Sequence, residues 1–159
     1  MNKGLPLLYI LTGILLFSCP TPIDRAKKFN NTIVTLHSEL NLEIEKFVDS
    51  FQSISSEKLE KNRIALSSYA DKIIKQTEEI PVVTNGTDFK NNAINLFKFY
   101  KSIIDGEFKE LVGLISEKPD TYRIIEIKKA ISEKTAVIDE RFRQSQREFA
   151  AQHNLKIAQ

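Results

Sequence analysis

The sequence holds one cysteine, one methionine and no tryptophan among its 159 residues. A single cysteine cannot form an internal disulfide, so the disulfide-stabilised small secreted scaffolds are excluded. Five glycines and five prolines are too few for a collagen-like or low-complexity chain. The 23 Lys and Arg residues against 21 Asp and Glu leave a formal charge of +2, which is too small for a dedicated nucleic-acid-binding protein.

The common catalytic and metal-binding motifs are missing as well. The sequence contains no H-E-x-x-H, C-x-x-C, G-x-S-x-G or G-x-x-x-x-G-K stretch. Di-iron helical bundles use Glu-x-x-His pairs, but Val34 and Ala150 stand three positions before His37 and His153. We therefore expect no catalytic residue, no metal site, no nucleic-acid partner and no small-molecule substrate. On this basis we expect the protein not to be an enzyme.

The N-terminus has the pattern of an export signal. Lys3 is followed by an apolar run over residues 5–17, which is 13 residues long. A membrane-spanning helix needs about 20 apolar residues, whereas the apolar region of a signal peptide needs roughly 7–15. The length of the run therefore favours a signal peptide.

The end of this run resembles a bacterial lipobox. Leu16 lies three positions before Cys19, and the small residue Ser18 lies directly before it. Phe17 is larger than the strict pattern prefers, as in the looser lipoboxes of spirochaetes. The resemblance implies diacylglycerol transfer to the Cys19 sulfur, cleavage between Ser18 and Cys19, and acylation of the new amino group, with no other cofactor. The alternative is a buried N-terminal helix in which the cysteine is incidental.

This interpretation divides the chain into three parts. Residues 1–18 are a lipoprotein signal peptide, residues 19–22 are the lipidated cysteine and a tether, and residues 23–157 form one domain. Thr21 as N-cap with Pro22 at the first helical position is a favourable start for a helix.

Apolar residues recur at spacings of three and four through most of the domain, which predicts amphipathic helices. The expected helices run from about 23 to 53, 56 to 80, 88 to 115 and 120 to 157. No segment alternates with a period of two, so no sheet is expected. Four long helices with short connections predict an all-α fold, an antiparallel up-down-up-down four-helix bundle behind the signal peptide.

Two glycines fall inside the expected third helix. Gly106 and Gly113 are seven residues apart and so lie near one face, and each costs about 1 kcal/mol relative to alanine in a helix interior. Close approach of a neighbouring helix is one explanation for them. A deformable segment that opens for a partner is the other.

A few polar residues are candidates for binding. Arg141, Arg143 and Arg147 on the last helix form a possible patch for an anionic ligand, diluted by interleaved glutamates. His37 lies beside the first apolar stripe and is expected to be a half-buried boundary histidine, with a pH-sensitive contact as the alternative. His153 is assigned no role. Paired carboxylates on the helices are expected to form a solvated face.

The stretches LFKFYKSI at 96–103 and EFKE at 107–110 carry a pattern of aromatic and charged residues. Together with the lipobox and the segment 69–81, they resemble the ErpY-like surface lipoproteins of Leptospira, a family of small helical lipoproteins. The resemblance implies an outer-membrane protein, lipid-anchored at Cys19 and exposed on the cell surface. It also implies binding of host proteins, among them complement regulators such as factor H, and clotting or matrix proteins.

The resemblance supplies no catalytic or binding residue that can be transferred by position. The alternative function is that of a periplasm-facing structural or envelope-assembly lipoprotein with a bacterial partner.

Overall fold

The computed structural model describes residues 20–117 and 121–157. Ser18 and Cys19 of the lipobox, and the rest of the predicted signal peptide, lie outside the described residues. The regular structure of the described residues is helical and contains no strand, which confirms the all-α prediction. Its elements are α1 (Pro22–Asp49), the short 3-10 helix η1 (Ser50–Gln52), α2 (Ser56–Glu79), α3 (Thr87–Asp105), α4 (Glu107–Glu117) and α5 (Thr121–Gln152).

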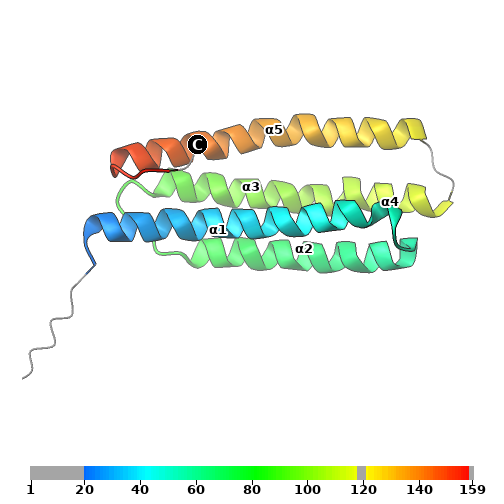
Figure 1. The fold of residues 1–159 in the computed structure, drawn as a ribbon, viewed down its shortest axis with the longest axis horizontal. Helices are drawn as coiled ribbons and strands as arrows, with labels where there is room; N and C mark the ends of the chain where they lie inside the picture. Colours follow the sequence, from blue (N-terminus) through cyan, green and yellow to red (C-terminus); the bar gives the residue numbers. More distant parts are fainter. Residues whose placement is uncertain (1–19, 118–120, 158–159) are drawn as a thin grey trace, which may run out of the picture.

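The helices lie side by side along one long axis, with α4 continuing in the direction of α3 (Figure 1). The start of α1, the α2–α3 loop and the end of α5 share one end of the molecule, which we call the tether end. η1, α4 and the start of α5 share the opposite, distal end. α2 packs on α1 and on α3, and α5 packs on α3 and α4.

The first two helices begin at the residues that the sequence predicts. The Thr21 hydroxyl accepts a hydrogen bond from the Asp24 N–H at 3.2 Å, and the Asp24 carboxylate accepts one from the Thr21 N–H at 3.2 Å. This reciprocal pair is a capping box, with Pro22 at the first helical position. The Ser55 side chain caps α2, and α2 ends two residues before Pro81.

The core at the tether end is built from phenylalanines of three helices. The Phe149 ring lies 5.3 Å from that of Phe29 and 5.5 Å from that of Phe89, between ring centroids. The Phe89 ring in turn lies 5.5 Å from that of Phe142. All four side chains are buried, as the apolar stripes predict. This core and the α1 cap both lie within the described residues.

The expected third helix is interrupted. Gly106 separates α3 from α4 with φ −102° and ψ −86°, values outside the helical region. A Cβ at Gly106 would lie 3.1 Å from the Ser102 carbonyl oxygen, so the crowding comes from the chain's own preceding turn. Gly113 is inside α4, and a Cβ there would meet nothing within 4 Å. Close approach of a neighbouring helix is therefore the wrong explanation for both glycines.

Two helix ends also differ from the expected boundaries. α1 ends at Asp49 instead of about 53, and the Ser50 hydroxyl donates to the Phe47 carbonyl at 2.6 Å where the helix gives way to η1. Serine side chains compete in this way for backbone groups. α5 ends at Gln152 instead of 157, and Asn154 then adopts a left-handed conformation with φ 54°.

Candidate functional site

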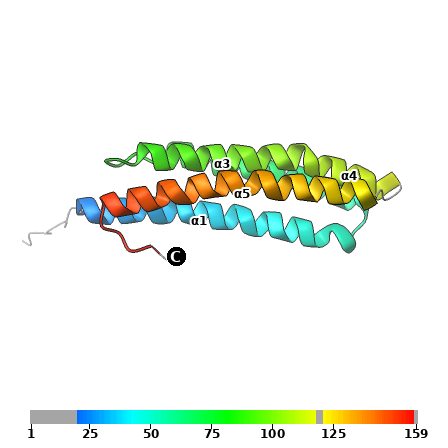
Figure 2. The same cartoon turned by 90° about the horizontal axis from the view of Figure 1, so that it is seen from above.

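An apolar groove lies between α1 and α5, with a volume of about 400 Å³. α1 and α5 both pack on α3, but among the described residues they make little backbone contact with each other. Figure 2 shows α1 turning away from α5 toward the distal end. Apolar side chains from both walls face the opening, including Ile44 and Val48 of α1 and Ile131 of α5.

A layer of hydrogen-bonded polar side chains closes the groove toward the tether end. The Tyr100 hydroxyl on α3 donates to Asp139 Oδ1 on α5 at 2.5 Å. Burial, together with the neighbouring Asp139 carboxylate, raises the pKa of Tyr100, so the phenol remains a donor at neutral pH. Asn41 on α1 completes the layer beside them.

His37 lies just behind this layer, on the core side. Its ring centroid is 4.7 Å from that of Phe142, and its Nε2 lies 3.0 Å from Asn41 Nδ2. Burial lowers the pKa of His37, the nearby Asp139 carboxylate opposes that effect, and Arg143 adds to it. The side chain is half-buried, so the prediction of a boundary histidine is confirmed.

The distal part of the groove is lined by aromatic and aliphatic side chains. Phe51 of η1 and Phe108 of α4 form its wall, and Phe47 packs within 5.1 Å and 5.2 Å of their ring centroids. Lys128 of α5 lies at the rim, exposed. Within the part of the chain that the structure describes, Lys128 forms no ion pair with its α5 neighbours or with α4.

The three arginines predicted as one patch do not form one. Arg143 and Arg147 both pair with Glu140, at 3.5 Å and 2.5 Å. The pKa of Glu140 is lowered, mainly by the hydrogen bond from Arg147. Arg141 lies two residues from Arg143, which places it about 200° round the helix. The arrangement leaves a partly neutralised pair on one face and Arg141 on another.

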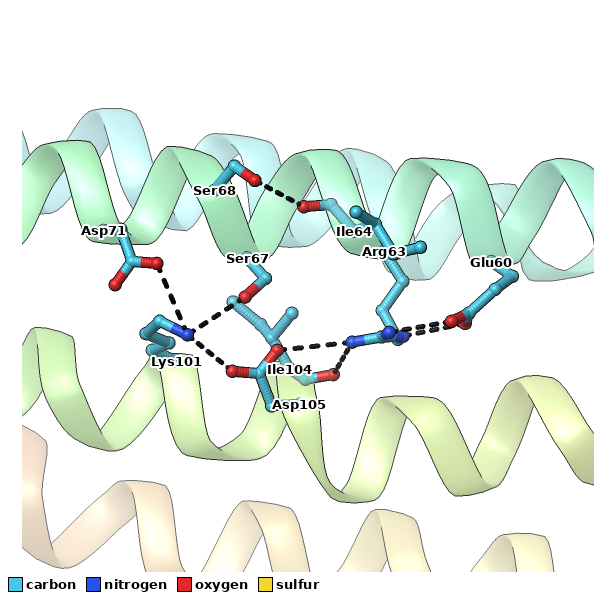
Figure 3. Close-up of polar contacts among 9 residues, drawn as sticks. All are labelled: Glu60, Arg63, Ile64, Ser67, Ser68, Asp71, Lys101, Ile104 and Asp105. Carbon is cyan, nitrogen blue, oxygen red and sulfur yellow. Dashed lines mark hydrogen bonds and ion pairs between the residues drawn. The ribbon is translucent and has the colours of Figure 1, made fainter.

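One buried charge was missed by the sequence analysis. Arg63 on α2 has a side chain only 9% exposed, and its Nη1 donates to the Ile104 carbonyl at 3.3 Å (Figure 3). This carbonyl is at the C-terminal end of α3, where helical carbonyls lack intrahelical donors and carry partial negative charge. Arg63 therefore caps the helix that breaks at Gly106. The only signal in the sequence is the missing apolar residue between Leu59 and Leu66.

Carboxylates surround this arginine and link it to a second cation. Arg63 pairs with Glu60 at 2.7 Å and with Asp105 at 3.3 Å. Asp105 also pairs with Lys101 at 2.6 Å, and Lys101 reaches Asp71 on α2 at 3.5 Å (Figure 3). Every charge in this network has a partner, so we interpret it as structural, a brace between α2 and α3.

The His153 side chain, given no role from the sequence, joins two loops. Its Nε2 lies 2.9 Å from the Thr84 carbonyl oxygen, and its ring packs 4.5 Å from that of Phe149. This contact ties the end of α5 to the α2–α3 loop, which also supports a structural role.

Among residues 20–117 and 121–157, no three His, Cys, Asp or Glu side chains lie close enough together to hold a metal ion. None of the helices in these two ranges is both long and apolar enough to cross a membrane. Comparisons with protein-family models, with curated proteins and with solved structures give no match for the chain. A functional proposal therefore rests on the residues of this chain and on the lipoprotein resemblance.

Proposed function

We propose that the chain is a lipid-anchored protein of the bacterial outer membrane, exposed on the cell surface, whose up-down-up-down helical bundle binds host proteins and performs no catalysis. The supporting observation is the place of Cys19, the only cysteine, three residues before the capped start of α1. Each buried CH₂ of an acyl chain contributes about 0.8 kcal/mol to membrane binding, and stable anchoring takes two chains or more. The host ligands follow from the resemblance: complement regulators such as factor H, and clotting or matrix proteins.

The anchor defines which end of the bundle faces outward. α1 has 28 residues and is therefore about 42 Å long. Lys27 and Lys28 lie exposed in its first turns, where they suit anionic lipid headgroups. A bundle standing on this tether presents its distal end to the surroundings (Figure 1).

The distal end carries an exposed aromatic and aliphatic pair. Tyr122 and Ile125, at the start of α5, are 73% and 59% exposed and lie about one helical turn apart. Tyrosine is enriched in protein interfaces because it combines a large apolar ring with a polar hydroxyl. We assign the host-protein contact to this Tyr122–Ile125 surface. The aromatic side chains Phe97 of α3 and Phe108 of α4 are not available for this contact, because they are buried.

Binding to immobilised factor H tests the assignment. Tyr122→Ala combined with Ile125→Ser should weaken binding at least tenfold, since truncating central aromatic anchors typically costs more than 1.4 kcal/mol. Val137→Ser is the matched control, because Val137 is 58% exposed on the same helix but away from its start. The control should bind within about twofold of the wild type. Equal binding by the double variant and the control would contradict the assignment of the contact to this surface.

Surface exposure is tested separately, by protease treatment of intact cells. A surface-exposed lipoprotein is degraded on whole cells. Protection until the cells are lysed would contradict the proposal and favour the periplasm-facing role with a bacterial partner.

A further inference from the structure

We propose that the groove between α1 and α5 binds the acyl chain of a fatty acid, with the carboxylate at Lys128. This inference goes beyond the proposed function and does not depend on it. The volume of about 400 Å³ is within the range of about 300–1,000 Å³ that is typical of small-molecule sites. The walls are mostly apolar, with Ile44, Val48 and Phe51 on one side and Ile131 on the other.

The length of the groove sets the length of the extended chain that it can hold. Asp139 and Lys128 both line it and are 11 residues apart on α5, so the groove is about 16 Å long. Carbon–carbon bonds of about 1.5 Å advance an extended chain by about 1.25 Å each, so about 13 bonds span the groove. The expected ligand therefore has about 14 carbons.

The charges at the two ends define the direction of the ligand. At the closed end Asp139 accepts the Tyr100 hydroxyl, and a second carboxylate beside it would be repelled. At the distal end Lys128 is exposed at the rim. Glu45, the other carboxylate of the lining, lies on α1 about 6 Å beyond Asn41 along the helix and is exposed to water. The carboxylate of the ligand thus belongs at Lys128 and its methyl end near Asn41.

The stripe residues in the groove agree with this interpretation. Ile44, Phe51 and Ile131 continue the core stripes of their helices, yet they are only partly buried because α1 and α5 diverge there. An acyl chain would cover them. Each additional CH₂ in contact with such a surface should raise the affinity about fourfold.

The direct test is calorimetric titration of the chain from residue 20, which contains the core of the described residues and the α1 cap and carries no lipid of its own. Helical circular dichroism and a cooperative thermal transition first establish that this chain folds. The probes are saturated fatty acids of increasing length, each below its micellar concentration. We expect one saturable site, with the affinity rising about fourfold per carbon up to about 14 carbons and no further. Absence of saturable binding, or an affinity that rises without a plateau, would overturn the proposal.

Variants locate the site. Thr135→Trp, which fills the groove from α5, should abolish binding, and Ile44→Trp, which fills it from α1, should do the same. Both are first checked for helical circular dichroism and a cooperative thermal transition, so that one filling variant remains informative if the other is unfolded. Unchanged binding by a folded filling variant would place the ligand elsewhere.

The placement of the ligand carboxylate at Lys128 has its own control. Lys128→Glu should weaken tetradecanoate binding about fivefold, as expected for an exposed ion pair, and leave tetradecanol binding unchanged. Lys129→Glu makes the same charge change one residue away, at a side chain 75% exposed and paired with Glu133 at 3.9 Å. It should leave both ligands unaffected. If the two variants weakened tetradecanoate binding equally, a specific contact at Lys128 would be contradicted.

Discussion

At the residue scale, the core depends on aromatic side chains, and two that are close in the sequence can differ in how deeply they are buried. Phe97 is 0% exposed, and its ring lies 6.3 Å from that of His37, whereas Phe99, two residues on, is only partly buried. Phe97→Ala should lower the free energy of unfolding by about 3–5 kcal/mol, because it leaves a cavity in a packed core. Phe99→Ala, the matched control, should cost about 1 kcal/mol. Urea denaturation measures both, and equal losses would show that the buried face is assigned wrongly.

His37 makes the stability dependent on pH. Burial, the dominant effect, lowers its pKa in the folded state, so the unfolded chain takes up the proton first as the pH falls. The stabilisation from neutral His37 is therefore complete above about pH 6.5, the ordinary histidine value, and is lost as the pH falls from there through the lowered folded pKa. Asn41 Nδ2 can only donate, so its contact with Nε2 also requires the neutral ring.

Denaturation of the wild type should give a lower free energy of unfolding at pH 5.5 than at pH 7.5. His37→Gln should abolish this difference. The carboxylates whose pKa values are lowered, such as Glu60 and Asp105, lose their contributions only near and below about pH 4, so the two effects are separable. A wild-type stability that does not change between pH 7.5 and 5.5 would contradict the burial of His37.

The sequence predicts apolar residues in the core better than polar ones. Phe29, Phe89 and Phe142 follow from periodicity alone, because a stripe can only be buried against other stripes. The burial of Arg63 does not follow from periodicity, because it depends on the carbonyl of Ile104, a residue 41 positions away in the chain. A partner at that sequence separation leaves no local pattern.

At the element scale, the two glycines of the α3–α4 segment should respond differently to substitution. Gly113 lies inside α4, and a Cβ there meets nothing within 4 Å, so Gly113→Ala should stabilise the protein by about 1 kcal/mol and raise Tm by about 2–4 °C. Gly106→Ala should give no such gain, because its Cβ would crowd the Ser102 carbonyl at 3.1 Å. Thermal denaturation of the two variants measures the difference. A higher Tm for Gly106→Ala than for Gly113→Ala would mean that α3 and α4 are one continuous helix.

The helix starts at Thr21 and Ser55 are predictable because capping is local chemistry. The break at Gly106 and the groove between α1 and α5 cannot be predicted from local sequence. The break involves Arg63 from another helix, and the groove depends on the angle between α1 and α5, which no single segment encodes. For the same reason, Ile44 and Ile131 lie in apolar stripes and yet line the groove.

At the scale of the whole molecule, the two ends of the bundle have different properties. The tether end is closed by the phenylalanine core and by a hydrogen bond of 3.1 Å between Gln146 on α5 and Asn30 on α1. The distal end has the groove and the exposed Tyr122 and Ile125. In the proposed arrangement the tether end stands near the membrane and the distal end faces outward. Each part of this arrangement depends on a lipid at Cys19.

Lipid attachment is therefore the claim to test most directly, by metabolic labelling with palmitate combined with mass spectrometry of the mature N-terminus. The wild type should carry acyl label and begin at an acylated Cys19. Cys19→Ser should lose the label and remain an uncleaved precursor, because the lipoprotein peptidase acts after acyl transfer. Membrane fractionation alone is a weaker test, since an uncleaved signal peptide also holds a protein to the membrane. An unmodified Cys19 in the wild type, or a mature terminus at another residue, would contradict the account.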